Sequence, residues 1–385
     1  MSPRSGYIAN AVLLKTTTLN RLSLKEPRCF IFKPDGIGDF FLASGVVRLM
    51  ARELGEKNLT IAVLPILESV VRGQFPQAQV VILPIKKQRV ILNVFVANCL
   101  RCFPSWIKLL GTKADTAISL RHMRDYLQSF LFYSVRAGGR FMTSNLLLGN
   151  GRRVRRWTEK IMVALFSTEM VDYPKPSFGI PSELEAHRLL VSAALRRDVE
   201  IGEIWPELKA VNPSPIDSLN FPYFVCAPYS SDIWKNFPEH RWIELFVLLD
   251  AEGKGERLRT LILTGSPDQR ESLESFGVMI RKALPEARIS ISVLISENLQ
   301  GFIDLLAGAE CVFTIDTAAA HGATALNCRT LILFSGLHQG MFAPWIRSHR
   351  QHWVLPKESQ SNLQWHEAHS TSEIMISLDK ILSAP

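Results

Sequence analysis

Short runs of branched and apolar residues alternate along the first half of the chain with segments in which apolar residues recur at helical spacing. The runs predict buried parallel strands at residues 29–33, 60–64, 80–85 and 116–120. The segments between them predict crossover helices, of which residues 40–54 are the clearest. This half therefore predicts a doubly wound α/β domain.

The alternation stops at residues 172–181, where prolines exclude both a helix and a central strand. We expect the joint between two domains here. Ser182 is followed three residues later by Glu185, a capping-box arrangement that predicts a connecting helix to about residue 197.

A second alternating series follows the connecting helix. It predicts strands at residues 223–227, 259–264, 288–294, 311–315 and 330–334, and helices at residues 239–249, 268–283 and 299–307. Two doubly wound halves form a cleft, the usual place for a ligand in α/β proteins. The expected division is an extension (1–27), a first Rossmann-like domain (28–175), a linker with the connecting helix (176–221) and a second Rossmann-like domain (222–385).

Composition narrows the class of protein. With 385 residues, 47% hydrophobic and 21% charged, the chain is an ordinary globular protein and neither disordered nor fibrous. It has no apolar run long enough to span a membrane, and the short apolar stretch at residues 8–14 lacks a cleavage site. Six scattered cysteines do not form a disulfide framework. We expect a cytoplasmic protein and leave open peripheral contact with the inner face of the cytoplasmic membrane.

The net charge of +8 is unevenly distributed. Residues 136–156 contain six arginines and no carboxylate, which favours an anionic partner such as a phosphorylated glycan or an anionic membrane, although a solvated loop has the same composition. No nucleic-acid-binding module accompanies the arginines, so we expect no nucleic acid partner. Residues 95–110 mix aromatic and aliphatic side chains with Arg101 and Lys108, which fits either a core helix or a membrane-surface helix.

The most informative segment is residues 313–326, where an apolar strand runs into Asp316-Thr317 and then a helix of small residues. The first turn of a helix leaves backbone N–H groups unpaired and carries the positive end of the dipole, so this junction predicts a diphosphate site. Ala318 and Ala319 keep side chains out of the way, and His321 adds an imidazole. A plain N-cap would explain Asp316 and Thr317 as well.

The first strand is followed by a turn that contains Gly36, Gly38 and Asp39. The glycines allow a tight turn, and Asp39 opens the next helix at the cleft side of the sheet. Phe41 stands where the dinucleotide fingerprint requires its third glycine, which argues against NAD. Asp39 is therefore either a helix cap or a general base.

Two loops of the second half also suit a phosphorylated ligand. The strand at residues 223–227 leads through Ser230 and Ser231 to Lys235, a cation close to a helix start. The next strand ends at Thr264 and opens into Gly265, where a base and ribose could lie.

Taken in order, the G-x-G-D turn (36–39), the P-x-S…W-K-x-F-P segment (228–238), the T-G-x-P segment (264–267) and the D-T…H helix start (316–321) resemble glycosyltransferase family 9, the heptosyltransferase-like enzymes of lipopolysaccharide assembly. The resemblance implies the GT-B fold, with the nucleotide sugar bound mainly by the second domain and the acceptor by the first. It implies that Asp39 activates the acceptor hydroxyl, that Lys235 contacts the donor phosphates, that Asp316 contacts the donor sugar, and that residues 317–319 offer backbone N–H groups to the diphosphate.

We therefore expect an inverting glycosyltransferase that moves a sugar, by resemblance heptose from ADP-heptose, to a lipopolysaccharide core or a related lipid-linked or phosphorylated glycan. The expected acceptor contacts are the arginines of the first domain: Arg121, Arg124, Arg136 and Arg140. No ligand set for a metal is found, and no cofactor is expected. A sugar-nucleotide epimerase of the same fold and a non-catalytic glycolipid or anion binder remain alternatives.

Overall fold

The computed structural model of the protein describes residues 27–85, 92–121, 126–143, 161, 163–166, 168–175, 180–212, 222–251, 260–285, 289–337, 339–356, 365 and 369–383. The predicted extension at residues 1–27 lies outside these ranges except for its last residue, as do Arg124 and the arginines at 152, 153, 155 and 156.

The first half is built on a six-stranded parallel sheet with the order β3-β2-β1-β4-β5-β6. Its strands are β1 (Cys29–Phe32), β2 (Leu59–Val63), β3 (Gln79–Ile82), β4 (Lys113–Ser119), β5 (Arg136–Thr143) and β6 (Thr168–Val171). Its helices are α1 (Ile37–Leu54), α2 (Glu68–Gln74), α3 (Leu92–Gly111), α4 (Tyr126–Tyr133) and α6 (Ser182–Leu195), with short 3-10 turns η1 (Glu56–Asn58), η2 (Pro65–Leu67) and η3 (Ile201–Ile204).

The second half repeats the same topology, with the order β12-β11-β10-β7-β8-β9. Its strands are β7 (Phe224–Ala227), β8 (Thr260–Leu263), β9 (Ser290–Val293), β10 (Cys311–Ile315), β11 (Thr330–Leu333) and β12 (Gln351–Val354). Its helices are α7 (Glu239–Ala251), α8 (Arg270–Ala283), α9 (Leu299–Ala307), α10 (Ala318–Ala325) and α11 (Thr371–Ser383), with 3-10 turns η4 (Ile233–Lys235) and η6 (Pro267–Gln269). Both orders are those of a doubly wound nucleotide-binding fold, which confirms the predicted fold class.

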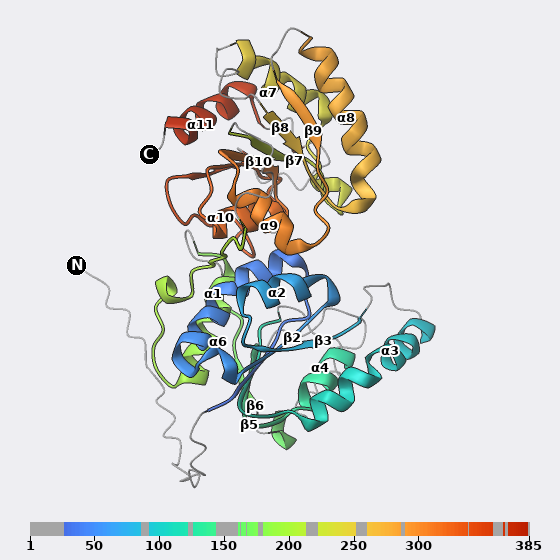
Figure 1. Cartoon of the computed structure of the whole chain (residues 1–385). Helices are drawn as coiled ribbons and strands as arrows, with labels where there is room; N and C mark the ends of the chain where they lie inside the picture. Colours follow the sequence, from blue (N-terminus) through green and yellow to red (C-terminus); the bar gives the residue numbers. More distant parts are fainter. Residues whose placement is uncertain are drawn as a thin grey trace, which may run out of the picture.

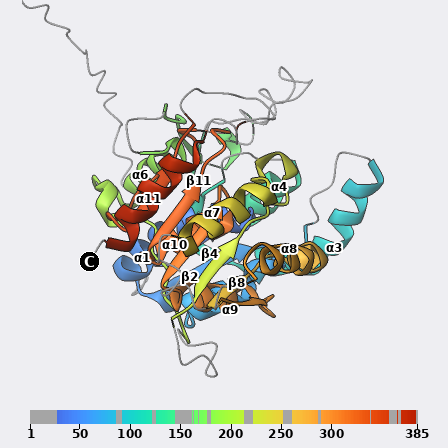
Figure 2. The same cartoon turned by 90° about the horizontal axis from the view of Figure 1, so that it is seen from above.

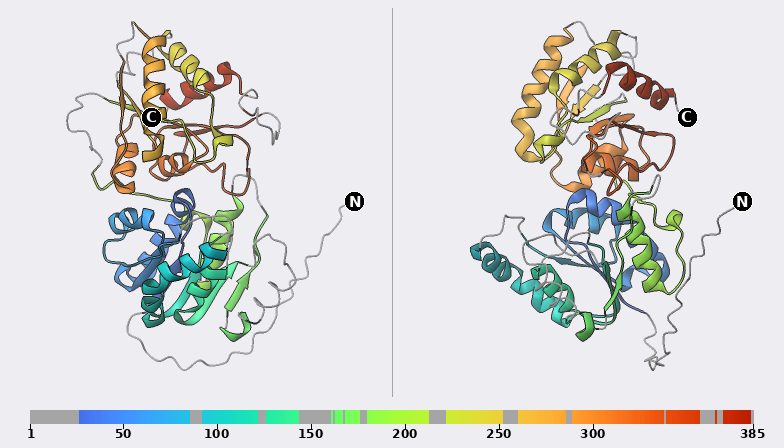
Figure 3. Two further views of the ribbon diagram at one scale, coloured as in Figure 1. Left: turned by 90° about the vertical axis from the view of Figure 1, so that its right-hand side faces the viewer. Right: turned by 180° about the vertical axis from the view of Figure 1, so that it is seen from behind.

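The two halves face each other through α1 and α2 on one side and α9 and α10 on the other (Figure 1). Alternate residues of each strand point to opposite faces of the sheet. In the first half, α1, α2 and α6 cover one face and α3 and α4 the other. In the second, α7, α8 and α11 cover the outer face and α9 and α10 the face toward the first half (Figure 3).

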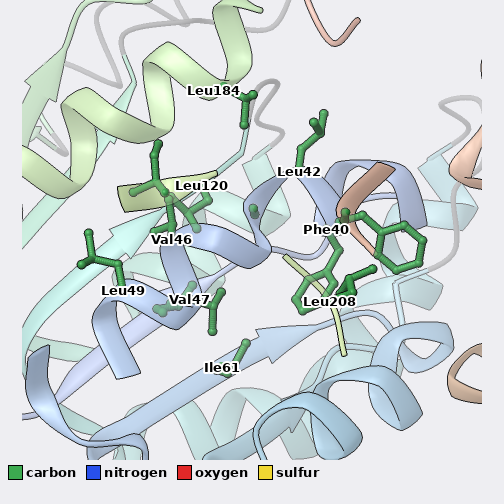
Figure 4. Close-up of a cluster of buried hydrophobic side chains, with 14 of the residues drawn as sticks. Phe40, Leu42, Val46, Val47, Leu49, Ile61, Leu120, Leu184 and Leu208 are labelled. Atoms are coloured by element: carbon green, nitrogen blue, oxygen red, sulfur yellow. The ribbon is translucent and has the colours of Figure 1, made fainter. Parts of the chain in front are cut away.

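Residues 40–47 of helix α1 are mostly apolar and are covered on every side. Every residue from Phe40 to Val47 is buried, as expected for a helix without a polar face. Its side chains meet β2, α6 and the segment that carries Leu208 in one hydrophobic cluster (Figure 4). That cluster also contains Ala320 and Phe334 of the second half, so the core continues across the interface.

Strand β5 was not predicted, and it replaces the solvated loop that was left open as an alternative for the start of residues 136–156. Residues 136–143 form a strand that pairs in parallel with β4 and β6. The local sequence does not predict this strand, because it contains charged arginines and Gly138-Gly139, and glycine is a poor strand former. Pairing with a strand on each side outweighs this local preference. Strands β6 and β12 and helix α11 were likewise not predicted.

The connecting helix α6 begins at Ser182, but the predicted capping box is wrong. The N-cap residue is Pro181, which has no capping side chain. Glu185 instead accepts two hydrogen bonds from Arg188, at 2.6 and 2.9 Å. Ser182 and Glu183 are buried and their backbone N–H groups donate to the carbonyls of Gly340 and Met341, which tie the helix start to the second half.

Helix α3 lies at the periphery of the first half (Figure 2). Asn98, Cys102 and Leu109 are buried against the protein, whereas Leu100, Phe103 and Ile107 are more than half exposed. The helix therefore packs through one face and leaves an apolar face uncovered. Within the ranges that the structure describes, no helix combines the length and the apolar character needed to cross a bilayer.

Candidate active site

A cavity of about 690 Å³ lies between the two halves, at the carboxyl ends of the strands of both sheets. The first half contributes the start of α1 after β1, and the second half contributes the loops after β7, β8, β9, β10 and β11. Ligands of doubly wound sheets bind at this edge, beside the point where the strand order reverses. Most of the predicted site residues line it: Gly38, Asp39, Ser230, Ser231, Lys235, Gly265, Asp316, Thr317, Ala318, Ala319 and His321.

The turn between β1 and α1 places Asp39 in this cavity. Its carboxylate accepts a hydrogen bond from the backbone N–H of Gly36 at 3.2 Å, so Asp39 caps the helix and also lines the cavity. A Cβ on Gly36 would lie 3.0 Å from the Asp39 carboxylate, and one on Gly38 would lie 3.0 Å from the His321 ring. The two glycines therefore allow close approach, Gly36 to Asp39 and Gly38 to the second half.

Across the cavity, β10 runs into α10 as predicted. Thr317 is the N-cap, and its hydroxyl accepts the N–H of Ala319 at 3.3 Å. The Lys235 ammonium lies 2.8 Å from the Asp316 carboxylate, with side chains 20% and 6% exposed. A cation, a carboxylate and a helix N-terminus thus converge on one wall, which suits a diphosphate attached to a hydroxylated group.

His321 is held as a neutral imidazole on the same wall. Burial lowers the pKa of His321 to about 4; Asp316 acts in the opposite direction and Lys235 adds to the lowering. Trp345 Nε1 donates to His321 Nδ1 at 3.0 Å, so the ring proton of the neutral form resides on Nε2, the nitrogen 4.0 Å from Asp316 Oδ1. His321 therefore offers an N–H donor beside Asp316.

The loops after β7 and β8 have different roles in the site. The N–H of Ser230 donates to Asn236 at 2.7 Å and its hydroxyl accepts from Asp232, which fixes the loop before Lys235, while Ser231 is exposed at the cavity. Thr264 does not line the cavity, since it is 1% exposed and its hydroxyl donates to the Leu294 carbonyl at 2.7 Å. Thr264 joins the ends of β8 and β9, and Gly265 reaches the ligand space.

A buried ionic cluster that the sequence analysis missed lies beside the Asp39 turn. The ammonium of Lys33, which is fully buried, lies 3.1 Å from Asp35 and 3.2 Å from Glu183 and donates to the Leu120 carbonyl at 2.6 Å. Burial alone would lower the pKa of Lys33, but Asp35, Glu183 and Asp39 raise it above its usual value. Lys33 is therefore a permanent positive charge near Asp39.

Tyr173 and His187 complete this cluster from the connecting segment and α6. Tyr173 donates to Glu183 at 3.2 Å, and His187 Nε2 lies 3.3 Å from the other oxygen of Glu183. Burial, followed by the charges of Glu183 and Asp39, raises the pKa of Tyr173 well above its usual value. Tyr173 stays protonated and can only donate to the carboxylates around it.

The three described arginines among those predicted for the acceptor do not line the cavity. Arg121 is 3.1 Å from Asp35 and donates to the Pro34 carbonyl at 2.9 Å, so it supports the turn that carries Asp39. Arg140 is buried, and its guanidinium donates to the carbonyls of Val135, Ala137 and Phe166, at 2.5, 3.3 and 2.9 Å respectively. Arg136 is exposed at the amino end of β5, the opposite edge of the sheet from Asp39. Arg124 is outside the described ranges.

Other cavity residues had not been predicted. They include Tyr229, Gln269, Ser296, Glu297, Asn298 and Phe302. Residues 296–298 follow β9, and the rule that parallel strands carry ligands at their carboxyl ends would have indicated them. Among the residues described, no group of three or more His, Cys, Asp or Glu side chains is arranged to hold a metal ion.

The chain is similar to known proteins both in sequence and in fold. The model of glycosyltransferase family 9 (heptosyltransferase) matches residues 160–370. Lipopolysaccharide heptosyltransferase 1 of Escherichia coli K12 is 28% identical over 127 residues, which are 33% of this chain and only 35% of that protein. The chain thus aligns with about a third of the length of this relative.

The solved structures of similar fold include two that cover more than nine-tenths of the chain. E. coli heptosyltransferase WaaC with ADP-2-deoxy-2-fluoro heptose has a TM-score of 0.62 at 15% identity, covering 91% of this chain and 99% of that one. E. coli ADP-heptose lps heptosyltransferase II has a TM-score of 0.64 at 15% identity, covering 92% and 98%. At such identities the likeness shows the fold alone, which is GT-B.

Proposed function

The chain belongs to glycosyltransferase family 9, the heptosyltransferase family, and from that premise we propose that it transfers a sugar from a nucleotide-diphosphate donor to a surface glycan with inversion at the anomeric carbon. The observation that carries the proposal is the single cavity lined by Asp39 from one half and by Lys235, Asp316 and the start of α10 from the other. One carboxylate thus faces an anion site across a space of ligand size.

The proposed donor is ADP-heptose. Lys235 and the backbone N–H groups at the start of α10 would bind the diphosphate, since a cation and a helix N-terminus both favour negative charge. Lys235 pairs with Asp316; a bound donor would share this ammonium and bring its sugar hydroxyls to Asp316. The two solved structures named above are a heptosyltransferase with ADP-2-deoxy-2-fluoro heptose and an ADP-heptose lps heptosyltransferase, which supports this donor.

The proposed acceptor is a hydroxyl of a lipopolysaccharide core or a related phosphorylated glycan, in keeping with the named relative. Asp39 would remove the proton of this hydroxyl as it attacks the anomeric carbon. The bond from that carbon to the diphosphate breaks at the same time, and charge grows on the leaving phosphate, where Lys235 and α10 stabilise it. Lys33 and Tyr173, which both contact Glu183, belong to the buried cluster that supports the turn carrying Asp39.

A direct test combines nucleotide binding with transfer. We expect ADP and ADP-heptose to raise the melting temperature more than UDP, GDP or dTDP do, because a ligand that binds only the folded state stabilises it. We also expect transfer of heptose to lipopolysaccharide that lacks its outer sugars, and mass spectrometry of the lipopolysaccharide measures this transfer. Interconversion of the free nucleotide sugar without transfer would instead indicate an epimerase, and binding without any turnover would indicate a non-catalytic binder.

Asp39→Asn tests the general base. The amide oxygen can still accept the Gly36 N–H, so the fold and donor binding should persist while kcat falls about 10²- to 10⁴-fold. Asp268→Asn, an exposed carboxylate that does not line the cavity, is the matched control and should retain full activity. Equal activity of the Asp39 variant and the wild type would remove Asp39 from the mechanism.

A further inference from the structure

An apolar surface on the first half has no part in the cavity. Leu100, Phe103, Ile107 and Leu110 of α3 are 71%, 51%, 54% and 40% exposed, and they recur at the three- and four-residue spacing of one helix face. This face points away from the buried residues of the same helix and extends for about 15 Å. Helix α3 is at the periphery of the molecule in two perpendicular views (Figures 1 and 2).

Aromatic residues extend this surface onto the neighbouring helix. Phe130 of α4 is 48% exposed. Its ring lies 5.6 Å from that of Trp106, which lies 5.7 Å from that of Phe103. The Trp106 N–H donates to Ser134 at 2.9 Å, which fixes this row of rings against the protein. The apolar surface is therefore continuous and held in place.

The charged residues of α3 and α4 within the described ranges are all basic. Arg101 and Lys108 are exposed on one flank of α3, and neither α3 nor α4 contains a carboxylate. Lys113 and Arg136 are register partners at the start of β4 and β5, both exposed, and add positive charge beyond the end of α3. An apolar stripe with basic flanks is the pattern of helices that lie in the interface of an anionic bilayer.

A second copy of the chain fits this surface less well than an anionic bilayer does. A two-fold interface through this surface would place α3 against α3 and bring the Arg101 and Lys108 side chains of both copies together. The chain offers no carboxylate on α3 or α4 to compensate for that repulsion. Anionic headgroups supply this compensation, and acyl chains cover Phe103 and Ile107.

We propose that the surface formed by α3 and Phe130 docks on an anionic lipid bilayer, with Leu100, Phe103, Ile107 and Leu110 entering the acyl region and Arg101 and Lys108 contacting lipid phosphates. This inference concerns residues outside the cavity and stands apart from the proposed transfer. If the acceptor is lipid-linked, the docking brings the first half of the protein to the membrane that carries it.

The test is sedimentation of the full chain with vesicles. We expect binding to phosphatidylcholine vesicles that contain phosphatidylglycerol, weaker binding to pure phosphatidylcholine, and weakening by salt. Phe103→Ser combined with Ile107→Ser should lower the partition coefficient on the order of tenfold or more. The matched control is Ile376→Ser on α11, which is 56% exposed and should bind vesicles like the wild type.

A charge variant and two further measurements complete the test. Arg101→Glu combined with Lys108→Glu should abolish the preference for phosphatidylglycerol, whereas Lys380→Glu, an exposed lysine of α11, should not. Circular dichroism and the thermal shift with ADP should match the wild type in every variant. Absence of wild-type binding to the anionic vesicles, equal loss in the Ile376 variant, or a dimer that the Phe103 and Ile107 changes dissociate would each overturn the proposal.

Discussion

At the scale of single residues, buried charge sets the chemistry of the site. Lys33 is fully buried, yet its pKa is raised because Asp35, Glu183 and Asp39 surround it. Removing one partner of such a group leaves an uncompensated charge, which costs about 3 to 5 kcal/mol of stability. The cluster is therefore expected to be sensitive to substitution even though only Asp39 lines the cavity.

His321 gives a residue-scale prediction on pH. Its pKa is lowered to about 4 in the folded protein, against a usual value near 6.5. The unfolded chain therefore binds the extra proton first, so stability is lost as the pH falls from about 6.5 toward 4, by up to about 3 kcal/mol. Urea unfolding over this pH range measures the loss, and His321→Phe should reduce it.

The exposed His240 provides the control for this prediction. His240→Gln, a change of an exposed side chain that does not line the cavity, should leave the pH dependence of the unfolding free energy as in the wild type. An identical pH dependence in the wild type and in the His321 variant would contradict the assignment of the loss to His321.

At the scale of elements, α1 joins three parts of the molecule. Its first turn carries Asp39, its middle packs on the first sheet, and Gly45 meets the segment that connects the two halves. A Cβ on Gly45 would lie 2.0 Å from the Ile204 carbonyl oxygen and 2.5 Å from that of Trp205. Only glycine lets the helix and this backbone approach so closely.

Gly45→Ala should therefore lower the free energy of unfolding by about 3 kcal/mol. This is at or above the largest loss usually seen when a side chain is enlarged at a well-packed site, because here backbone atoms must move. The midpoint of guanidinium unfolding measures this. The matched control is Gly202→Ala in η3, where a Cβ would meet nothing within 4 Å and stability should change little. A midpoint for Gly45→Ala within error of the wild type would show that the helix can shift at no cost.

At the scale of the whole molecule, the two sheets share one core. Ile303, Ala320 and Phe334 of the second half belong to the same hydrophobic cluster as Phe41 and Val46 of α1. Polar contacts add to it, since Gln74 of α2 donates to Gln300 of α9 at 3.2 Å and Gln300 donates to Asp304 at 2.9 Å. The interface between the halves, which shares residues with the cavity lining, is therefore packed like a protein interior.

We accordingly expect one cooperative unfolding transition in differential scanning calorimetry, with equal calorimetric and van't Hoff enthalpies. The shared cluster couples the halves because neither can unfold without exposing apolar surface of the other. Two resolved transitions would show that the halves fold independently and that the shared core contributes little.

The sequence alone determined the two doubly wound halves and most of the cavity. Residues 29–32 are apolar throughout and residues 311–315 are apolar except for Thr314, which predicts both strands, and parallel topology places the loops after them at one edge. Asp39, Lys235 and Asp316 could therefore be named in advance as residues that meet there. Their positions depend on the local pattern of apolar residues and on strand direction, and both can be deduced from the amino-acid sequence.

Tertiary structure alone decided which polar groups pair and which apolar groups are covered. Lys33 and Glu183 form an ion pair although they are 150 positions apart in the sequence. Arg140 is buried, and its guanidinium donates to backbone carbonyls rather than facing solvent where a glycan could bind. Strand β5 forms in spite of its glycines because it pairs with a strand on each side. The apolar face of α3 is likewise exposed only because the fold places that helix at the edge. Burial and charge pairing depend on neighbours that are distant in sequence, and the local pattern of apolar and polar residues does not specify those neighbours.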